Sequence, residues 1–521
     1  MSIKRLGDAL LFLGREHQRE AWQASTVEDL SRVLDRYGLD CALVNASSSR
    51  TVNAFRGNEE LFAAVEADSR LIPSPSIIPD AGGELGDEES FVDDLIKRGA
   101  RSVCHHPTTH RTGLDVRVIG KLYEVLQRRR LPVSLFETNL LDAADLAKRY
   151  PLLPIILHAP TYRDLTFIPA FKDAVNLHIS LMPNFAAFRG VESFVKTFGA
   201  DRILFATGFP LHEPGAPLAY LAFADISSED REKIAFGNLE RLMKAVQVPQ
   251  GSTPLKLEHA DPNGRARGMC EPAYAGRPIE LAGMVDMHAH YGRLRWYPYP
   301  DVDGNALVNE LDRCGIEKIL VSPTPAMTTE VRWSNDRVIA AVKEHPGRIM
   351  GYAICYPVTK ELGIDEIERA VGAGLHGVKM HNANKIPYDD PGYAPVWRFA
   401  DEHRLPVLLH TWGDLEPLVS VMEKTTKAPV LLGHAGAGSG AKKYIEFAKR
   451  FSNAYLELCW SKVPYGLIEH FVAEVGAERV LWGSDAPAMA VSQQFGRILF
   501  ADISDEDKHT ILVSNPKRIL G

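Results

Sequence analysis

The chain has 521 residues, a formal net charge of −8 and a pI near 6.2. The acidic balance argues against a nucleic-acid partner, because nucleic-acid-binding domains present a basic face. No apolar stretch approaches the roughly 18 residues of a membrane span, and the six cysteines contain no C-x-x-C pair. We therefore expect a cytoplasmic protein of two ordinary domains, with no membrane segment and no disulfide framework.

The same sequence occurs twice in the chain. Residues 223–243 (FADISSEDREKIAFGNLERLM) recur at 500–520 (FADISDEDKHTILVSNPKRIL), and residues 201–210 (DRILFATGFP) recur at 478–487 (ERVLWGSDAP). Both pairs are offset by 277 residues. The repeat indicates a tandem duplication of one domain, so the two copies can be compared residue by residue.

The offset divides the chain into three expected parts. The first copy occupies 1–245 and the second occupies 281–521. Between them, 246–280 is rich in Pro, Gly and polar residues and has no period, which is typical of a linker. Near the start of each copy, LGDALLFLG at 6–14 lies opposite MVDMHAHYG at 284–292.

Each copy alternates short apolar runs with segments of helical pattern. In the first copy the expected strands are DALLFL, CALVN, LIPSPS, RSVCH, PVSLF, PIIL, NLHIS and RILFAT. In the second copy they are 284–288, 318–322, 349–354, 376–380, 406–410, 429–433, 454–458 and 480–484. Helical patterns such as 303–315 and 393–404 lie between the strands. Eight strand–helix alternations without hairpin signals predict an α/β protein built from two tandem (β/α)8 TIM-type barrels.

Polar side chains in the second copy follow the ends of the expected strands, where functional residues of such barrels lie. His288 and His290 end the first strand, and strand alternation puts both imidazoles on one side. His410 ends the fifth strand, His434 follows the sixth and Asp485 follows the eighth. Three imidazoles with one carboxylate, from His288, His290, His410 and Asp485, suit Zn²⁺ or another divalent ion with an open position.

The second copy resembles the amidohydrolase superfamily, in the branch that contains aminocarboxymuconate-semialdehyde and resorcylate-type decarboxylases. The resemblance rests on VDMHAHYG, GVKMHNANKIPYDDPGYAPVWRFADEHRLPVLLHT, LLGHAG, VLWGSDAP and NPKRIL, which come in the order of the family. It implies one divalent metal, with zinc the first choice and manganese, iron or cobalt as alternatives. It implies that the metal ligands are His288, His290, His410 and Asp485, and that His434 and Asp485 transfer protons.

The first copy lacks every one of these ligands. The residues opposite His288, His290, His410 and Asp485 are, in order, Leu10, Phe12, Phe136 and Gly208. Only His434 has a counterpart, His158. Apolar side chains do not bind a cation, so the first copy is predicted to be a metal-free, degenerate barrel, a pseudoenzyme domain.

Further candidates flank the predicted site. Lys379 ends the fourth strand, where some superfamily members carry a carbamylated lysine between two metals, although a single metal is favoured here. Arg293, Arg295 and Trp296 follow the His-x-His pair, and Trp412 follows the fifth strand. These side chains would suit a planar substrate that carries a carboxylate. The alternative interpretation is an aromatic loop packed on the barrel rim.

The sequence favours a metal-dependent hydrolase that attacks a small amide, lactone or related carboxylate with a metal-activated water. One alternative is a metal-dependent non-oxidative decarboxylase of an aromatic or unsaturated acid. Another, from a different class, is a non-catalytic binding or scaffold protein. Relatives in this family commonly form dimers, so we expect the two copies to pack as an intrachain pseudo-dimer, with further oligomerisation open.

Overall fold

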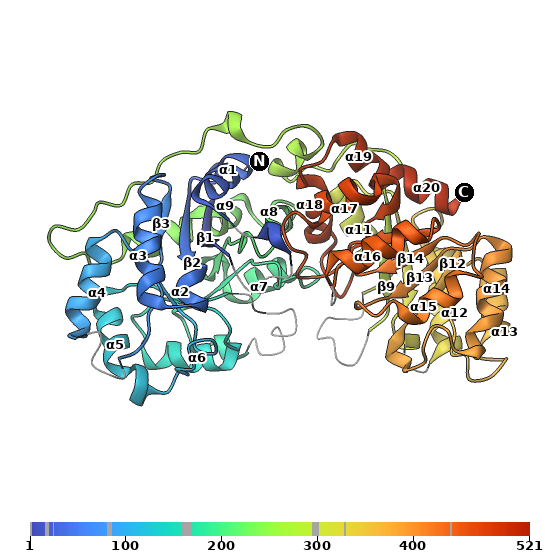
Figure 1. The fold of residues 1–521 in the computed structure, drawn as a ribbon, viewed down its shortest axis with the longest axis horizontal. Helices are drawn as coiled ribbons and strands as arrows, with labels where there is room; N and C mark the ends of the chain where they lie inside the picture. Colours follow the sequence, from blue (N-terminus) through green and yellow to red (C-terminus); the bar gives the residue numbers. More distant parts are fainter. Residues whose placement is uncertain are drawn as a thin grey trace. The chain divides into compact units, whose positions relative to one another are not determined.

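The chain forms two compact units, Met1–Arg267 and Gly268–Gly521 (Figure 1). The computed structural model describes residues 3–15, 20–23, 25–80, 86–158, 160, 169–293, 302–327, 330–437 and 440–521. In both units every predicted apolar run contains a strand, and helices fill the intervals between strands. The expected α/β class is therefore confirmed.

The second unit is an eight-stranded parallel barrel. Its strands follow one another in chain order: β9 (Val285–Tyr291), β10 (Lys318–Pro323), β11 (Ile349–Ile354), β12 (Gly377–Met380), β13 (Val407–His410), β14 (Val430–Gly433), β15 (Ala454–Glu457) and β16 (Val480–Leu481). Backbone hydrogen bonds from Met287 to Trp482 (3.2 Å) and from Asp485 to His288 (2.7 Å) join the last strand to the first. These bonds close the barrel and bring the ends of β9 and β16 together.

The first unit has the same strand order in two sheets. One sheet contains β1 (Gly7–Leu13), β2 (Cys41–Ala46) and β3 (Leu71–Pro73). The other contains β4 (Val103–His105), β5 (Val133–Leu135), β6 (Ile155–Leu157), β7 (Leu177–Ser180) and β8 (Ile203–Leu204). An isolated parallel bridge between Ser76 and Cys104 connects the two sheets. A hydrogen bond from Ala9 to Phe205 (2.9 Å) joins β1 to the residue after β8, so this unit is also barrel-like.

Helices alternate with the strands in both units (Figure 1). Those of the first unit are α1 (Val27–Tyr37), α2 (Ser47–Thr51), α3 (Ala54–Val65), α4 (Glu88–Lys97), α5 (Val116–Arg129), α6 (Leu140–Arg149), α7 (Gly190–Phe198), α8 (Gly215–Ala222), α9 (Ser228–Glu232) and α10 (Asn238–Lys244). Those of the second unit are α11 (Gly304–Cys314), α12 (Val331–Glu344), α13 (Ile364–Gly372), α14 (Ala394–His403), α15 (Glu416–Met422), α16 (Ala441–Arg450), α17 (Leu467–Val475), α18 (Val491–Phe500), α19 (Asp505–His509) and α20 (Asn515–Leu520).

Helix α11 illustrates how the sequence sets these boundaries. The side chain of Asp303 accepts a hydrogen bond from the Ala306 amide (2.8 Å), which satisfies a donor at the helix start. Gly315 ends the helix at φ 82°, a left-handed conformation that glycine adopts without strain. Both residues stand at the ends of the helical pattern predicted at 303–315.

The ends of the two units repeat the same interactions. A π-helical segment lies at Lys233–Gly237 in the first unit and at Thr510–Ser514 in the second. In the first unit the side-chain amide of Asn238 donates to the carbonyls of Ala200 and Ile203, both at 2.8 Å. In the second unit the amide of Asn515 donates in the same way, at 2.8 Å to each of two carbonyls. The repeat in the sequence is thus also a repeat of local structure.

The segment between the copies is divided between the units. The Thr253 amide donates to the Lys97 carbonyl (2.9 Å) and the Ala260 amide donates to Asp40 (2.8 Å), so its first part bonds to the first unit. From Gly268 onward it bonds to the second, where the Met269 amide donates to Asp505 (3.0 Å). Its composition carried no signal for this division, because neither part has a helical or strand period.

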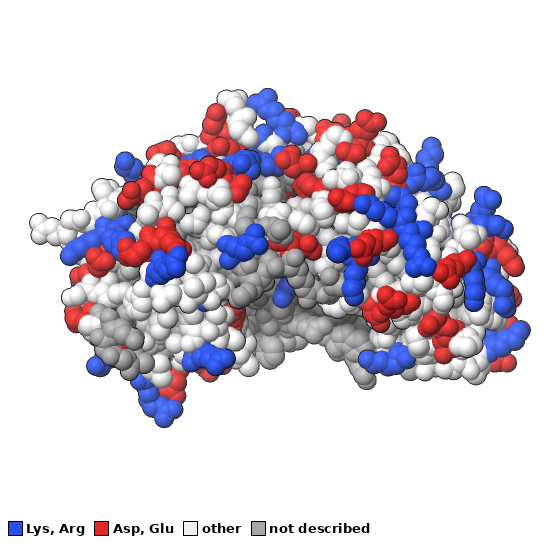
Figure 2. Space-filling view, in the orientation of Figure 1, with Lys and Arg blue, Asp and Glu red and all other residues white. Residues whose placement is uncertain are grey.

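Among the described residues, no helix combines the length and the apolar character needed to cross a bilayer. On the face drawn in Figure 2, acidic and basic side chains are interspersed over both units. This pattern agrees with the acidic composition of the chain and does not resemble a continuous basic surface.

A buried aspartate stands beside the closure of each barrel. Asp8 accepts hydrogen bonds from the Leu10 amide (2.9 Å) and from the Thr207 hydroxyl (2.7 Å). Asp286 accepts from the amides of His288 (3.1 Å) and Ser484 (3.0 Å). Burial raises the pKa of both carboxyls to about 7, although these hydrogen bonds act in the opposite direction. Both aspartates therefore favour a proton in the folded state.

The raised pKa predicts a specific pH dependence of stability for Asp8. Because the folded chain holds a proton that the unfolded chain releases near pH 4, this contribution is present below about pH 4 and is lost toward about pH 7. A shift of about three units corresponds to roughly 4 kcal/mol across that range. Asp8→Asn keeps an acceptor and cannot ionise, so its free energy of unfolding should fall less between pH 4 and 8. Equal pH slopes for variant and wild type, measured by urea unfolding, would contradict this.

Candidate active site

Strand β9 and the turn after β16 bring His288, His290 and Asp485 together. One ligand atom from each of the three lies within 4.8 Å of the other two. Nε2 of His290 lies 2.8 Å from Oδ1 of Asp485, and Nε2 of His288 lies 3.9 Å from the same oxygen. The side chains of both histidines are nearly or fully buried, and that of Asp485 is 14% exposed. The predicted alternation along β9 therefore places both imidazoles at one site.

His288 is held on both sides of its ring. Its Nδ1 lies 2.7 Å from Oε2 of Glu457, and its Nε2 lies 2.9 Å from Nζ of Lys379. A lysine ammonium has donors only, so Nε2 accepts and the ring proton resides on Nδ1. This is the tautomer in which Nε2 can take a metal ion.

Two glycines make room for this ring. A Cβ atom on Gly483 would lie 2.3 Å from Cβ of His288, and a Cβ atom on Gly433 would lie 3.1 Å from its Cε1. The first distance is far below van der Waals contact. The first copy has Ala206 and Leu157 opposite these glycines, where no imidazole has to fit.

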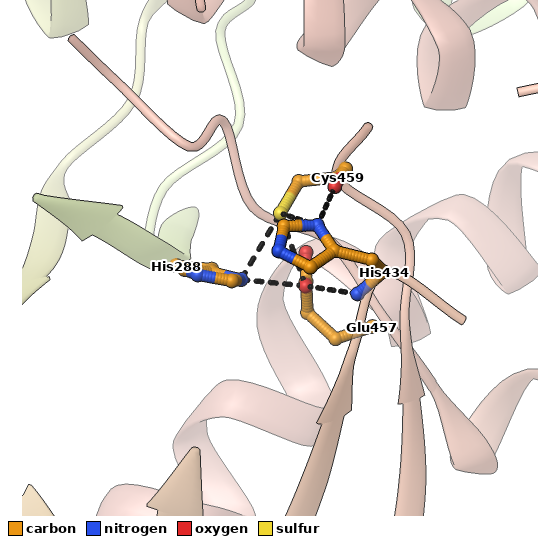
Figure 3. Close-up of side chains that lie close together, drawn as sticks. All are labelled: His288, His434, Glu457 and Cys459. Atoms are coloured by element: carbon orange, nitrogen blue, oxygen red, sulfur yellow. Dashed lines mark hydrogen bonds and ion pairs between the residues drawn. The ribbon is translucent and has the colours of Figure 1, made fainter. Parts of the chain in front are cut away.

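His434 and Asp485 have unusual backbone conformations. Their φ angles are 63° and 57°, in the left-handed region that non-glycine residues rarely adopt. Such strain persists where the surrounding structure fixes it, and it is common at functional sites. The carbonyl of Cys459 accepts a short hydrogen bond from Nδ1 of His434 (Figure 3). Because a carbonyl only accepts, Nδ1 carries the proton and Nε2 is the basic nitrogen.

The pKa shifts of the site residues indicate which side chains are neutral and which are charged. Burial lowers the pKa of His288, His290 and His434, so all three rings favour the neutral form. Burial acts to raise the pKa of Asp485, but its hydrogen bond with His290 and the attraction of neighbouring groups outweigh burial and lower it. Burial also lowers the pKa of Lys379 to about 8. Neutral imidazoles beside an ionised carboxylate form a donor set that a divalent cation fits.

The other predicted site residues differ in how close they lie to the group of three. His410 lies outside the group of three, with its ring centroid 4.7 Å from that of His434 and its buried Nδ1 without a hydrogen-bond partner. Trp412 is 54% exposed and stacks parallel to the His410 ring at 6.0 Å. Arg293 is exposed, and Arg295 and Trp296 lie outside the described residues. An unpartnered imidazole nitrogen at the site is consistent with a further metal ligand.

Three further residues lie at the site. Glu457 ends β15 and Cys459 follows it, and both are fully buried. Burial raises the pKa of Glu457 to about 8, although its hydrogen bond with Cys459 lowers it. The ring of His381, after β12, lies 4.2 Å from that of His410, and its Nδ1 accepts from the Ala383 amide (3.0 Å). Their position after strand ends was the only signal in the sequence.

At the positions of the proposed ligands, the first unit has apolar residues or glycine. Leu10, Phe12 and Met182 belong to one buried cluster, and Phe136 packs against it. The rings of Phe12 and Phe136 meet edge to face at 5.6 Å. Within the described parts of the chain, both groups of candidate metal ligands lie in the second unit.

A family model for amidohydrolases matches residues 56–244 and 285–521, which is more than half of the chain. The chain belongs to the amidohydrolase family. One matched segment lies in each unit, in agreement with the repeat. The family comprises enzymes, so this chain is an enzyme of the amidohydrolase family. A search of curated proteins found no match.

Solved structures similar to this chain each cover 46% of it. They include 2,6-dihydroxybenzoate decarboxylase from Rhizobium, at 16% identity over 99% of that chain with a TM-score of 0.40. Another is dihydroxybenzoic acid decarboxylase from Polaromonas sp. JS666 with bound manganese and 2-nitroresorcinol, at 18% identity over 97% with a TM-score of 0.38. A candidate 2-pyrone-4,6-dicarboxylic acid hydrolase from Pseudomonas putida has 16% identity over 98% and a TM-score of 0.39.

Proposed function

We propose that the second unit is a metal-dependent hydrolase of small amides, lactones or related carboxylates, and that it uses one divalent ion, with zinc the first choice. The proposal rests on one observation: the largely buried side chains of His288, His290 and Asp485 lie close together at the carboxyl end of a parallel barrel. His434 lies beside them, with its ring centroid 5.1 Å from that of His288. Manganese, iron and cobalt are the alternative ions.

His288, His290, His410 and Asp485 would hold the ion, which when bound supplies Lewis acidity toward a substrate oxygen and makes water more acidic. His434 is oriented by its bond to the Cys459 carbonyl, so its Nε2 can remove a proton from water. The same nitrogen can then return the proton to the leaving group. Asp485 is an ionised acceptor beside the site and can share this transfer. Two proton acceptors favour hydrolysis, in which water must lose a proton.

One observation favours non-oxidative decarboxylation as a second candidate. Trp412 presents an exposed ring parallel to that of His410, at an interplanar angle of 9°. A flat aromatic wall at the barrel mouth suits a planar aromatic or unsaturated acid. In that reaction His434 would deliver a proton to the carbon that loses CO₂.

Product analysis separates the two reactions. The zinc- or manganese-loaded protein is incubated with a panel of aromatic acids, muconate-like acids, lactones and amides. Hydrolysis forms one new carboxyl group, together with an amine or a hydroxyl group, and releases no CO₂, whereas decarboxylation releases CO₂ and removes one carboxyl group. Turnover with CO₂ release would replace the first proposal by the second. If elemental analysis finds no metal in the wild-type protein, both proposed reactions are wrong and a non-catalytic binding protein is favoured.

We also propose that the first unit is a structural partner of the second in an intrachain pseudo-dimer. The sequence of α8, GAPLAYLA, contains no charged residue, and its counterpart α18, VSQQFGRILF, contains one. A helix on the outside of a barrel normally carries a polar face, so α8, which has none, needs a cover.

Removal of the first unit tests this role. The second unit expressed alone as 268–521 should self-associate or precipitate, because the proposed apolar interface would then be exposed. Size-exclusion chromatography with light scattering measures the outcome. A monodisperse monomer with full metal content and full activity would show that the first unit is not a structural partner.

A further inference from the structure

The Nδ1 side of His288 carries a second group of potential metal ligands. His288, His434, Glu457 and Cys459 each bring one ligand atom within 4.8 Å of the others (Figure 3). Two of the four, Glu457 and Cys459, come from β15 and the residues after it. The group is either an ion site of its own or a support for the imidazoles.

The contacts have the lengths of hydrogen bonds. Oε2 of Glu457 lies 2.7 Å from Nδ1 of His288 and 3.1 Å from Sγ of Cys459. It also accepts from the backbone amide of His434 (3.3 Å). Ligands at about 2.0–2.3 Å around a tetrahedral zinc ion are farther apart than this, at about 3.3 Å or more. In addition, Nδ1 of His434 is already bonded to the Cys459 carbonyl.

We infer that Glu457 is a positioning residue, which holds the proton of His288 on Nδ1 and so directs Nε2 to the metal. The inference rests on the metal site proposed above. It assigns to Glu457 an effect on the affinity of that site for its metal ion. A metal-bound imidazole commonly donates its other N–H to a carboxylate, which fixes the ring and makes it a better ligand. The Cys459 carbonyl holds His434 by the same principle, so one strand end orients both rings.

The first copy supports this assignment. At the positions of His288, Glu457 and Cys459 it has Leu10, Ser180 and Met182. Leu10 and Met182 pack in the same apolar cluster. The carboxylate is thus absent in the copy that has no imidazole to hold. The retained histidine of that copy, His158, bonds to the Ser180 hydroxyl instead (3.1 Å). A carboxyl needed only to build the barrel would have no reason to disappear with the ligand.

Zinc affinity of the metal-free full-length protein, measured by competition with a chromophoric chelator, tests the inference. Glu457→Leu removes the acceptor and should weaken zinc binding up to about 100-fold. Glu457→Gln keeps one acceptor oxygen of the same shape and replaces the other by a donor, so its loss should be smaller, at about 10-fold. Ser180→Ala, at the equivalent position of the first unit, is the matched control and should bind zinc within about twofold of wild type.

Thermal melting of the metal-free variants separates folding from affinity. If Glu457→Leu does not fold, Glu457→Gln still decides. A Gln variant that melts like wild type and binds zinc equally well would overturn the inference but leave the proposed function intact. A wild-type protein that binds none of zinc, manganese, iron and cobalt would instead defeat the proposed function.

Cobalt substitution of the wild-type protein distinguishes a support from an ion site. We expect one Co²⁺ per chain and no thiolate-to-metal charge-transfer absorption, because Cys459 is not a ligand. Two Co²⁺ per chain, with a charge-transfer band that Cys459→Ser removes, would show that the four residues bind an ion themselves. That outcome would overturn the positioning role.

Discussion

His434→Asn is expected to lower kcat by about 10²–10⁴-fold while metal content stays near that of wild type. The ring centroid of His434 lies 5.1 Å from that of His288 and 4.7 Å from that of His410, and its Nδ1–H is bonded to the Cys459 carbonyl. Loss of a general acid–base group removes proton transfer without removing a ligand. Asparagine suits the test because it tolerates the left-handed backbone at φ 63° better than alanine does.

The matched control is His158→Asn, which changes the counterpart of His434 in the first unit. His158 is buried and bonds to the hydroxyl of Ser180. Among the described residues of the first unit there is no group of three potential metal ligands. This variant should keep both metal and rate. Metal lost from His434→Asn would make His434 a ligand, and near-normal turnover would remove it from the mechanism.

The fold could be predicted from the sequence because its signals are local. Apolar runs bounded by Gly, Pro and caps determine where strands and helices begin, as Asp303 and Gly315 do for α11. The His-x-His spacing could be interpreted because alternation along any strand puts residues i and i+2 on one side. Only the strand assignment was needed to place His288 and His290 together.

The contacts of the supporting residues could not be predicted in the same way. Glu457 reaches His288 only because β9 and β15 approach within one barrel and because Gly433 and Gly483 leave space between them. That approach depends on how the barrel closes, which no local pattern specifies. The ring contact between His381 and His410 likewise joins residues that follow two different strands. The division of the linker near Arg267 depends on bonds to Lys97 and Asp40, far away in the sequence.

Asp485→Gly should remove both metal and activity while the fold is kept. Glycine is the residue of the first copy at this position, where Gly208 has φ 67°, close to the 57° of Asp485. The substitution therefore relieves backbone strain and deletes only the carboxylate. Without that carboxylate, His288 and His290 lose the anionic member of the ligand group. We expect metal content to fall from about one ion per chain to near zero.

The accompanying loss in kcat/KM should be at least about 10³-fold, because the ion contributes several kcal/mol to transition-state stabilisation and each 1.36 kcal/mol is tenfold in rate. Elemental analysis and thermal melting of the metal-free protein measure the two effects separately. The melting temperature should stay near that of metal-free wild type, because the removal of backbone strain offsets the loss of the hydrogen bond to His290. Stoichiometric metal in Asp485→Gly would show that the ion is held elsewhere. A collapse of the metal-free fold would show that Asp485 is a structural residue first.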